Sequence, residues 1–393
     1  MFAAWLFLAF FGLALAGVPL LYALLGTTVG AILVAGLSHP LETIFLSFIG
    51  GVEPFILLAV PLFIFAGELL AQGGVGRRIV DFARALLGFL PGGLGVVTVA
   101  SCLMFGGVSG SAIADTAAIG SLVIPAMVQR GYSRGFAAAL LAVAGTLALL
   151  MPLSIPFLVY AFISGVSMRQ LSMAGIAPAI IAGAALMAVC VWHGRRTGCD
   201  SGDGRLSARE VWKATKAAGP ALLMPLIIVG GIWSGFFTPT ESAAVAVVYG
   251  IVVSLALYRD ITVRDLPRLL VNAFQTSATV MLVIGATGAL AWLITVEQVA
   301  VQMAAWIRLI ASEPWQFLLL VNVILLLAGN FMEPSSIVLI FAPILFPVAM
   351  KLGIDPVHFG IIMVVNMEVG MCHPPVGLNL YVASGITKMG ITE

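Results

Sequence analysis

Long apolar stretches separated by short polar breaks run along the chain from residue 2 to residue 386. A helix needs about 20 mostly apolar residues to cross the hydrocarbon core of a bilayer. Stretches near or above that length lie at residues 2–38, 53–72, 134–165, 172–192, 219–237, 240–257, 272–295 and 357–386. The first stretch has the length for two crossings. The pattern predicts an all-α integral membrane protein in which residues 1–393 form a single polytopic membrane domain.

Two further apolar regions, residues 92–127 and 315–350, follow a different pattern. Each consists of two arms that are short for a membrane crossing. Small and polar residues join the arms, in FGGVSGSAIAD (105–115) and in GNFMEPSS (329–336). Backbone that is not helical at membrane depth must be buried in protein or line a wet cavity. We therefore predict two re-entrant helical hairpins with these segments as their tips.

Prolines interrupt two of the long stretches. The interruptions are MPLSIP (151–156) within residues 134–165 and HPPVG (373–377) within residues 357–386. Proline removes a backbone donor and clashes with the preceding turn of a helix. We therefore predict two broken helices whose breaks face the hairpin tips.

The hairpins and broken helices recur in the same order. An offset of 222 residues pairs Gly107 with Gly329 and Pro152 with Pro374. Paired interruptions of this kind are the sequence pointer to a transporter binding site. The predicted repeats span residues 53–192 and 272–393, and the predicted scaffold elements are residues 1–72, 172–192, 219–257 and 272–312.

The distribution of basic residues predicts how the repeats are oriented. If each hairpin returns to the side that it entered from, 15 of the 18 Lys and Arg residues share one side. The positive-inside rule makes that side cytoplasmic. An odd number of crossings then separates Gly131 from Gly353, so the repeats are inverted. These features predict a secondary transporter built from an inverted repeat.

Composition excludes several classes of protein. Hydrophobic residues make up 61% of the chain and charged residues 9%, against roughly 45–50% and 25% in soluble domains. A net charge of +1 favours no nucleic-acid partner. The first segment has no basic n-region and no cleavage pattern, so we interpret it as a retained span. The four cysteines form no C-x-x-C pair, which indicates neither a zinc site nor a disulfide framework.

No hydrolase, Walker or dinucleotide-binding motif stands in a usable context. The chain is therefore interpreted as a secondary active transporter and not an enzyme, with no cofactor. Its energy comes from an ion gradient or from another subunit.

The tips and breaks carry the candidate cation ligands. Unwound carbonyls and hydroxyls at the ends of half-helices suit a hard, weakly held cation, and sodium is the usual one. The predicted sodium-binding residues of the first repeat are Ser109, Gly110, Ser111, Pro152 and Ser154. Those of the second repeat are Gly329, Asn330, Pro374, Val376 and Gly377. The alternative is that these small residues only allow helices to pack closely.

Half-helix N-termini also direct positive dipole ends toward the membrane midplane, which favours an anionic substrate group. We expect a carboxylate site between the tips. The predicted substrate contacts are Ser111, Asp115, Ser335 and Ser336. Helix N-capping is the alternative role for Ser335 and Ser336.

Ionisable groups inside a bilayer are functional hypotheses because their burial is costly. Five such residues lie within or at the ends of the apolar stretches: Glu68, Asp115, Glu241, Glu333 and Glu368. Asp115 follows the first tip and is expected to hold it in place by accepting its donors. Glu241, in TPTES, is predicted to cap a helix. Glu368 is either a proton site or the partner of a neighbouring donor. His373 either modulates a cation site or is a polar helix-end residue.

Four stretches resemble the large membrane subunit of the tripartite ATP-independent periplasmic (TRAP) transporters, and the resemblance covers nearly the whole chain. They are PLFIFAGELLAQGGVGRRIVDFARALLGFLPGG (61–93), FGGVSGSAIADTAAIGSLVIPAM (105–127), TPTESAAVAVVYG (238–250) and VHFGIIMVVNMEVGMCHPPVGLNLYVASGI (357–386).

The resemblance implies sodium-driven uptake of an organic anion by an elevator mechanism in the bacterial cytoplasmic (inner) membrane. It implies two partners, a soluble periplasmic substrate-binding protein and a small four-helix membrane subunit. The motif NMEVGMCHPPVGLNLY resembles that of family members that take C4-dicarboxylates, which favours a C4-dicarboxylate as the substrate. Sialic acid, keto acids and sugar acids are the alternatives. Family members usually continue with a further spanning helix, whereas this sequence stops at Glu393, which bears on the scaffold and not on the transport sites.

Two other functions are compatible with parts of the pattern. A self-sufficient sodium and anion symporter of the divalent-anion type shares the inverted hairpin plan. An ion channel is a more distant alternative, because channels usually repeat their filter motifs in parallel around an axis.

Overall fold

The computed structural model describes residues 2–34, 39–200, 202, 206–299, 302, 313–330, 332–373 and 377–390. These residues form helices and turns without a strand. The helices of the first half are α1 (Phe2–Leu15), α2 (Leu20–Val34), α3 (Leu41–Val52), η1 (Phe55–Leu58), α4 (Ala59–Gln72), α5 (Val75–Leu87), α6 (Gly93–Ser109), α7 (Ala112–Gln129), α8 (Arg134–Thr146), η2 (Leu147–Leu150), α9 (Ile155–Ser164) and α10 (Met168–Thr197). Those of the second half are α11 (Ala208–Ser234), α12 (Pro239–Ile251), η3 (Val252–Leu257), α13 (Leu266–Val296), α15 (Pro314–Gly329), α16 (Pro334–Lys351), α17 (Pro356–Met371) and α18 (Leu378–Thr387).

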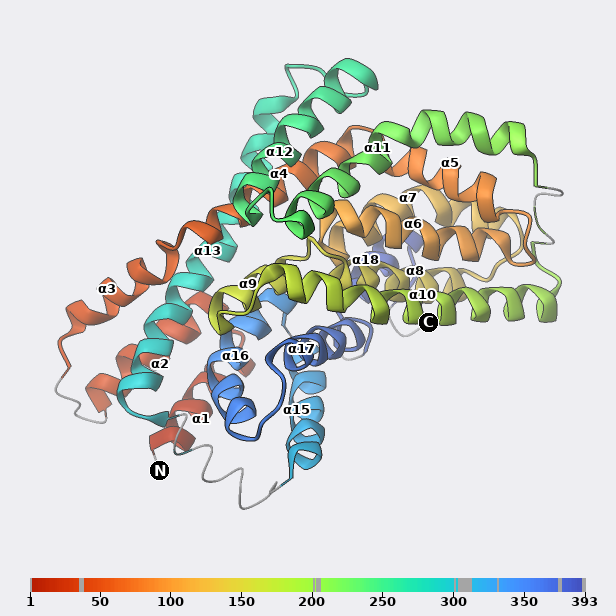
Figure 1. Ribbon diagram of the computed structural model, residues 1–393. Coiled ribbons are helices and arrows are strands. Elements are labelled where there is room, and N and C mark those ends of the chain that lie inside the picture. The colour runs from red at the N-terminus through yellow and green to blue at the C-terminus, as the bar shows by residue number, and fades with distance from the viewer. Residues whose placement is uncertain are drawn as a thin grey trace.

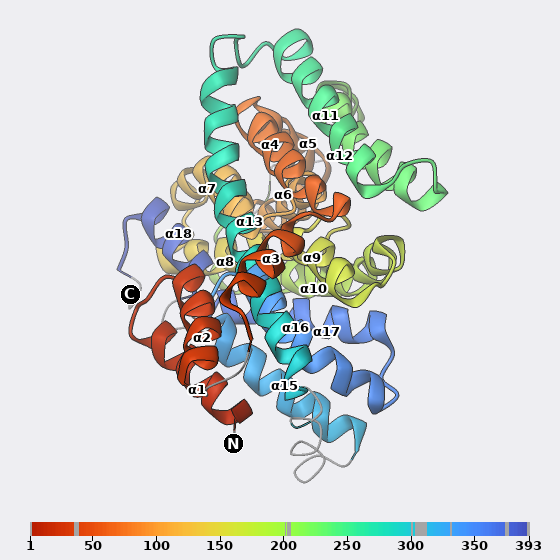
Figure 2. The same cartoon turned by 90° about the vertical axis from the view of Figure 1, so that its left-hand side faces the viewer.

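A group of long helices lies beside the hairpins. The helix α13 packs against α2, α3 and α4, and α4 also packs against α12. Figure 1 shows α3 and α13 side by side on the left of the molecule. They approach closely at two glycines, because a Cβ added to Gly51 would lie 3.1 Å from the Cα of Gly288. Figure 2, turned by 90°, shows α4, α11 and α12 grouped at one end.

Eight helical segments among the described residues are long and apolar enough to cross a membrane. They are Phe55–Gln72, Ala112–Gln129, Arg134–Ser164, Met168–Thr197, Ala208–Ser234, Pro239–Leu257, Leu266–Val296 and Pro334–Lys351. The predicted stretches 2–38 and 357–386 each consist of two shorter helices, and none of these helices is long enough to count as a membrane-crossing segment. The second arm of each hairpin, α7 and α16, has 18 residues and does qualify. Length alone therefore does not separate the hairpins from crossing helices.

Each hairpin region contains two consecutive helices, and each proline break separates two shorter ones. The arms α6 and α7 pack against each other, as do α15 and α16. The broken helices are α8 with α9, and α17 with α18. The contacts between them are crossed, because α7 packs against α18 while α16 packs against α9. Crossed packing of this kind is expected for two repeats related by a two-fold axis. The repeat and scaffold boundaries themselves stay predictions.

The predicted cap at Glu241 is confirmed. The side chain of Thr238 accepts a hydrogen bond from the backbone N–H of Glu241, and Glu241 accepts one from the backbone N–H of Thr238 at 2.7 Å. Two otherwise unpaired donors at the start of α12 are satisfied by this reciprocal capping box.

Asp200 joins the segment after α10 to the base of the first hairpin. Its carboxylate accepts a hydrogen bond from the backbone N–H of Leu94 at 2.7 Å and pairs with Arg130 at 2.8 Å. The hydroxyl of Tyr132 donates to the same carboxylate at 3.2 Å. Burial and the nearby charge of Asp200 raise the pKa of Tyr132, so this hydroxyl stays a donor. The start of α6 is thereby held against the connection between α10 and α11.

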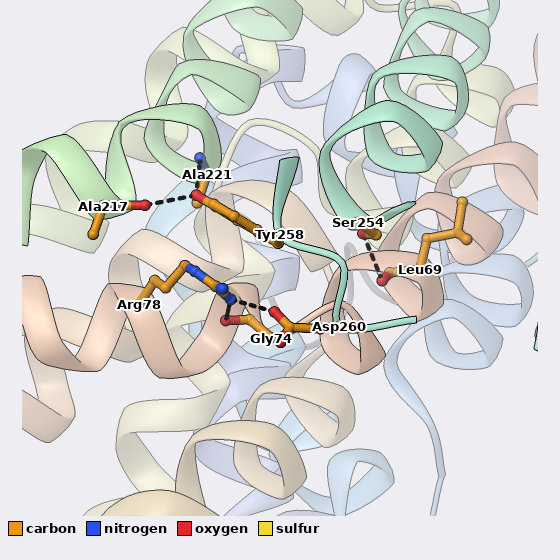
Figure 3. Close-up of polar contacts among 8 residues, drawn as sticks. All are labelled: Leu69, Gly74, Arg78, Ala217, Ala221, Ser254, Tyr258 and Asp260. Carbon is orange, nitrogen blue, oxygen red and sulfur yellow. Dashed lines mark hydrogen bonds and ion pairs between the residues drawn. The ribbon is translucent and has the colours of Figure 1, made fainter. Parts of the chain in front are cut away.

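Two tyrosines from α12 and its π-helical continuation η3 bind the backbone of α11 around Pro220. The hydroxyl of Tyr258 accepts a hydrogen bond from the N–H of Ala221 at 3.1 Å and donates to the carbonyl of Ala217 at 2.9 Å. It stands between two backbone groups that an α-helix normally joins directly (Figure 3). Tyr249 donates to the carbonyl of Pro220 at 2.8 Å. Proline is a usual cause of an opened helical ladder, and here a side chain from the next helix fills the opening.

The π-helical turn η3 explains how both tyrosines reach α11. In an unbroken α-helix, Tyr249 and Tyr258 would point in directions about 180° apart. A π turn adds one residue to the turn and reduces that angle to roughly 80°. Arg78 at the start of α5 also joins this contact. Its guanidinium lies 3.7 Å from the centre of the Tyr258 ring and donates to the carboxylate of Asp260 and, at 3.0 Å, to the carbonyl of Gly74 (Figure 3).

Candidate functional site between the hairpin tips

The first tip is a single left-handed residue between two helices. The arm α6 ends at Ser109, Gly110 adopts a φ of +60°, and Ser111 caps α7 by accepting a hydrogen bond from the N–H of Ala114 at 3.4 Å. A Cβ at Gly110 would lie 2.4 Å from the carbonyl oxygen of Leu153. Glycine is therefore required here both by the backbone conformation and by the approach of the break.

The first break is built from an extended turn followed by a capped helix. Met151 is extended, with φ −72° and ψ 151°, and Pro152 is buried beside it. Ser154 caps α9 by accepting a hydrogen bond from the N–H of Phe157 at 3.4 Å. The Cα of Ser154 lies 3.2 Å from the position of a Cβ at Gly110. Ser109, Gly110, Ser111 and the turn from Pro152 to Ser154 are thus brought together.

The second tip meets its own break in a related way. The carbonyl of Asn330 accepts a hydrogen bond from the N–H of Gly377 at 3.2 Å. With its amide nitrogen facing α17, Asn330 donates to the carbonyls of Gly370 and His373, at 3.3 Å each. A Cβ at Gly329 would lie 2.9 Å from the Cα of Gly370. The three predicted ligands Gly329, Asn330 and Gly377 therefore converge.

The remaining two predicted ligands of this set, Pro374 and Val376, lie outside the described residues. Their assignment stays a prediction, as does the use of all ten positions for sodium.

Asp115 lies behind the first tip. It is 0% exposed, and one carboxylate oxygen accepts a hydrogen bond from the hydroxyl of Ser109, which in turn accepts one from the N–H of Ser111 at 3.2 Å. The other oxygen points toward Gly106 and has no hydrogen-bond partner among the described residues. Asp115 therefore holds the tip through a serine hydroxyl, whereas backbone donors were expected, and it does not line the space between the tips.

Ser335 and Ser336 are engaged by Glu333, an ionisable residue that the sequence marks as functional but to which it assigns no specific role. Glu333 is the N-cap of α16, and its side chain accepts a hydrogen bond from the N–H of Ser336 at 3.2 Å. The hydroxyl of Ser335 donates to the other carboxylate oxygen at 2.9 Å. The alternative that either serine is the N-cap is therefore wrong. The signal in the sequence is Glu333-Pro334, an acidic cap followed by proline at the first helical position.

A small cavity lies where the two tips meet, with a volume of about 30 Å³. Its wall includes the start of α7 at Gly110 and Ser111, the start of α9 at Ile155 and Pro156, and the start of α16 at Glu333 and Ser335. Three helix N-termini thus converge on one space, and each contributes partial positive charge to it. No Lys, Arg or His belongs to the wall among the described residues.

Two buried polar residues near this site escaped the sequence analysis. Thr116 and Asn379 are 0% exposed, and each has a side-chain oxygen without a partner among the described residues. The amide of Asn379 donates to the carbonyl of Ala142 in α8 at 3.0 Å. Neutral side chains such as these carry no charge that would mark them in the sequence. Glu368 does carry one; it is 7% exposed, and one of its oxygens likewise has no partner among the described residues.

A polytopic helical membrane protein with paired hairpins and broken helices around a central site belongs to the class of secondary transporters. Residues 7–393 match the family model described as the tripartite ATP-independent periplasmic transporter, DctM component. The chain belongs to this family and is a TRAP transporter large permease, a multi-pass inner-membrane protein and not an enzyme.

Several relatives are similar over most of their length. The C4-dicarboxylate TRAP transporter large permease protein DctM of Rhodobacter capsulatus is 44% identical, over 97% of this chain and 89% of the relative. The protein of the same name from Pseudomonas aeruginosa is 45% identical, over 86% and 79%. The 2,3-diketo-L-gulonate TRAP transporter large permease protein YiaN of Escherichia coli is 36% identical, over 95% and 87%.

Proposed function

We propose that this permease drives uptake of an organic anion, a C4-dicarboxylate, with the energy of a sodium gradient. The observation that carries the proposal is the convergence of three helix N-termini on one cavity between the tips, with a tip and a break in contact on either side. The N-termini favour an anion. The hydroxyls and unwound carbonyls at each tip and break suit sodium.

The dicarboxylate assignment rests on similarity. The two relatives that are 44% and 45% identical carry the name C4-dicarboxylate, whereas the relative named for 2,3-diketo-L-gulonate is 36% identical. The members of this family are tripartite by description. We accordingly propose that a periplasmic binding protein delivers the substrate and that a small four-helix membrane subunit binds the permease.

The proposed mechanism is an elevator movement. The two hairpins and the two broken helices pack against one another and against α5 and α10, while α3, α4, α12 and α13 form a second group of contacts. The two groups meet where α13 packs against α16 and where α4 packs against α6. A movement of the first group past the second would carry the cavity between the two faces of the membrane. The cations between each tip and break would travel with it.

The test is uptake of labelled succinate into proteoliposomes that contain the permease, its small subunit and an inward sodium gradient. We expect uptake to require both the gradient and the loaded binding protein. Uptake that does not depend on the sodium gradient would refute the proposed coupling to sodium. Full uptake without the binding protein would favour the self-sufficient symporter, and passive flux without accumulation would favour a channel.

A further inference from the structure

The wall of the proposed anion site includes a carboxyl group of the protein itself, that of Glu333. Glu333 lines the cavity of about 30 Å³ between the tips, and it also lines an apolar cavity of about 850 Å³ on the other side of the second hairpin. The larger cavity lies between α1, α2 and the arms α15 and α16. Glu333 therefore stands at the boundary between a narrow polar space and a wide apolar one.

The hydrogen bonds of Glu333 are those expected of a bound substrate carboxylate. Its two oxygens accept from the N–H of Ser336 and from the hydroxyl of Ser335, at 3.2 and 2.9 Å. These are donors that the sequence assigned to the substrate. A carboxylate of the protein therefore already occupies the positive end of α16.

The first tip lacks this arrangement. The offset of 222 residues that relates the two repeats places Ser111 opposite Glu333. Both residues cap the second arm of a hairpin, and both line the cavity. The cap of α7 is neutral, and the carboxylate in the first turn of that helix, Asp115, is directed toward Ser109 and Gly106 and does not line the cavity. The cap of α16, in contrast, places a carboxyl group on the cavity wall. The two ends of the site thus differ in charge.

The size of the cavity determines what this difference means for a substrate. A buried water needs roughly 10–15 Å³ of such volume, so about 30 Å³ admits only small groups. A four-carbon diacid does not fit unless the wall retreats. The side of Glu333 that faces away from the tips has about 850 Å³ of open volume.

We propose that Glu333 is a tethered competitor of the substrate and determines the preference of the site between dicarboxylates and monocarboxylates. One substrate carboxylate binds at the neutral cap of α7. The second displaces Glu333 from the start of α16 toward the larger cavity and takes over the N–H of Ser336 and the hydroxyl of Ser335. A monocarboxylate needs no such displacement. The proposal rests on the function proposed above and specifies how the same site selects its substrate.

The cost of displacing Glu333 lowers the affinity for dianions, because only the fraction of molecules with the cap displaced is competent to bind them. Neutralising the cap should remove this cost. A carboxylate at a helix N-terminus changes an equilibrium by about a few-fold. We therefore expect Glu333→Gln to tighten succinate binding by about threefold or more, with a smaller change for butyrate.

The experiment measures succinate and butyrate binding to the purified permease with its small subunit, in saturating sodium, by isothermal titration calorimetry. Glu241→Gln is the matched control, because Glu241 is also a carboxylate that accepts a backbone N–H at the start of a helix but lies outside the cavity. The control should leave both affinities unchanged. Ser335→Ala in the Glu333→Gln background should reverse the gain for succinate, since it removes the donor released to the substrate.

Glu333→Ser provides a second variant if the first does not accumulate in the membrane, because it copies the neutral cap of the first tip. Unchanged or weaker succinate binding in a folded variant would overturn the proposal. So would an equal gain for succinate and butyrate, or a shift confined to the sodium concentration for half-saturation. Failure of wild-type uptake in proteoliposomes would instead refute the proposed function, because the binding comparison needs no transport.

Discussion

Individual residues determine how each hairpin tip contacts its break. In the first repeat, Ser109 is 4% exposed, is hydrogen-bonded to the buried Asp115 and is adjacent to Gly110, which lies against Leu153. Ser111 caps α7 at the cavity wall. Replacing the two serines by alanine removes two of the oxygen atoms that are predicted to bind sodium at this tip, and it leaves the hydrophobic surface of the tip unchanged.

We expect Ser109→Ala together with Ser111→Ala to raise the sodium concentration for half-maximal uptake by at least about fivefold, since one lost hydrogen-bond-like contact is worth about 1 kcal/mol. Ser121→Ala is the control, because Ser121 is exposed and its hydroxyl donates to the carbonyl of Ala118 in the same helix. Sodium dependence is measured in proteoliposomes. An unchanged half-saturation in the double variant would assign the small residues of this tip to helix packing alone.

Close backbone contacts also depend on single glycines. A Cβ at Gly106 would lie 2.6 Å from the Cα of Ala148, in the 3-10 turn of the first broken helix. A Cβ at Gly370, in the second broken helix, would lie 2.6 Å from the Cα of Gly329 at the end of the hairpin arm α15. Backbone cannot yield as the end of a flexible side chain can, so added atoms at these positions require the helices to separate.

We expect Gly106→Ala to lower the free energy of unfolding by about 1–3 kcal/mol, which is the usual cost of overpacking. Its neighbour provides the control, because a Cβ at Gly107 would lie 3.3 Å from the flexible end of Met151 and at an ordinary contact distance of 3.7 Å from the Pro225 ring. Thermal unfolding in detergent should show a clear decrease in Tm for the first variant and little change for the second. Equal Tm values would show that α6 can move away from the break without cost.

At the scale of elements, the π-helical turn after α12 joins three helices. It brings Tyr249 and Tyr258 to the same side of α12, where both bind the backbone of α11. Arg78, at the start of α5, lies over the Tyr258 ring. The helix α5 packs on both α11 and α6, so this contact links the first hairpin to the helices around α12.

We expect Tyr258→Phe to destabilise the permease by about 1–2 kcal/mol, because the N–H of Ala221 and the carbonyl of Ala217 lose their shared partner while the ring under Arg78 is kept. Tyr22→Phe is the control, since Tyr22 is 63% exposed. The Tm in detergent is the readout. If both variants unfold at the wild-type temperature, the backbone of α11 forms its own hydrogen bonds at this point and does not need the tyrosine hydroxyl.

At the scale of the whole molecule, the basic residues predict which face is cytoplasmic. The connection between α10 and α11 follows Arg195 and Arg196, which lie in the last turn of α10, and it is held to the base of the first hairpin by Asp200. Cys199 lies in this connection and is partly exposed. Its thiol therefore reports the side of the membrane on which the connection lies.

We expect Cys199, in a variant whose other three cysteines are replaced, to react in intact cells with a membrane-permeant maleimide and not with an impermeant one. The impermeant reagent should label it once the inner membrane is opened. Labelling of intact spheroplasts by the impermeant reagent would place this connection outside and would reverse the predicted orientation of both repeats.

Much of the fold was predictable because lipid imposes strong rules on sequence. Apolar length predicted the helices, and the prolines at Pro152 and Pro156 predicted a break whose turn the structure shows between Leu150 and Ile155. The motif of Thr238 and Glu241 predicted its capping box. The roles of Ser335 and Ser336 were only partly predictable, because the pattern does not reveal that Glu333 binds their donors.

The sequence by itself determined that this chain is a membrane transporter with two hairpins and two broken helices, since hydrophobic length, glycine and proline act locally. Only the tertiary structure decided which groups meet. Thr116 and Asn379 are buried near the tips without a charge to signal it, and Tyr258 enters the ladder of a different helix. Glu333 lies on the wall between two cavities. These facts depend on packing between segments far apart in the chain, and no local pattern encodes them.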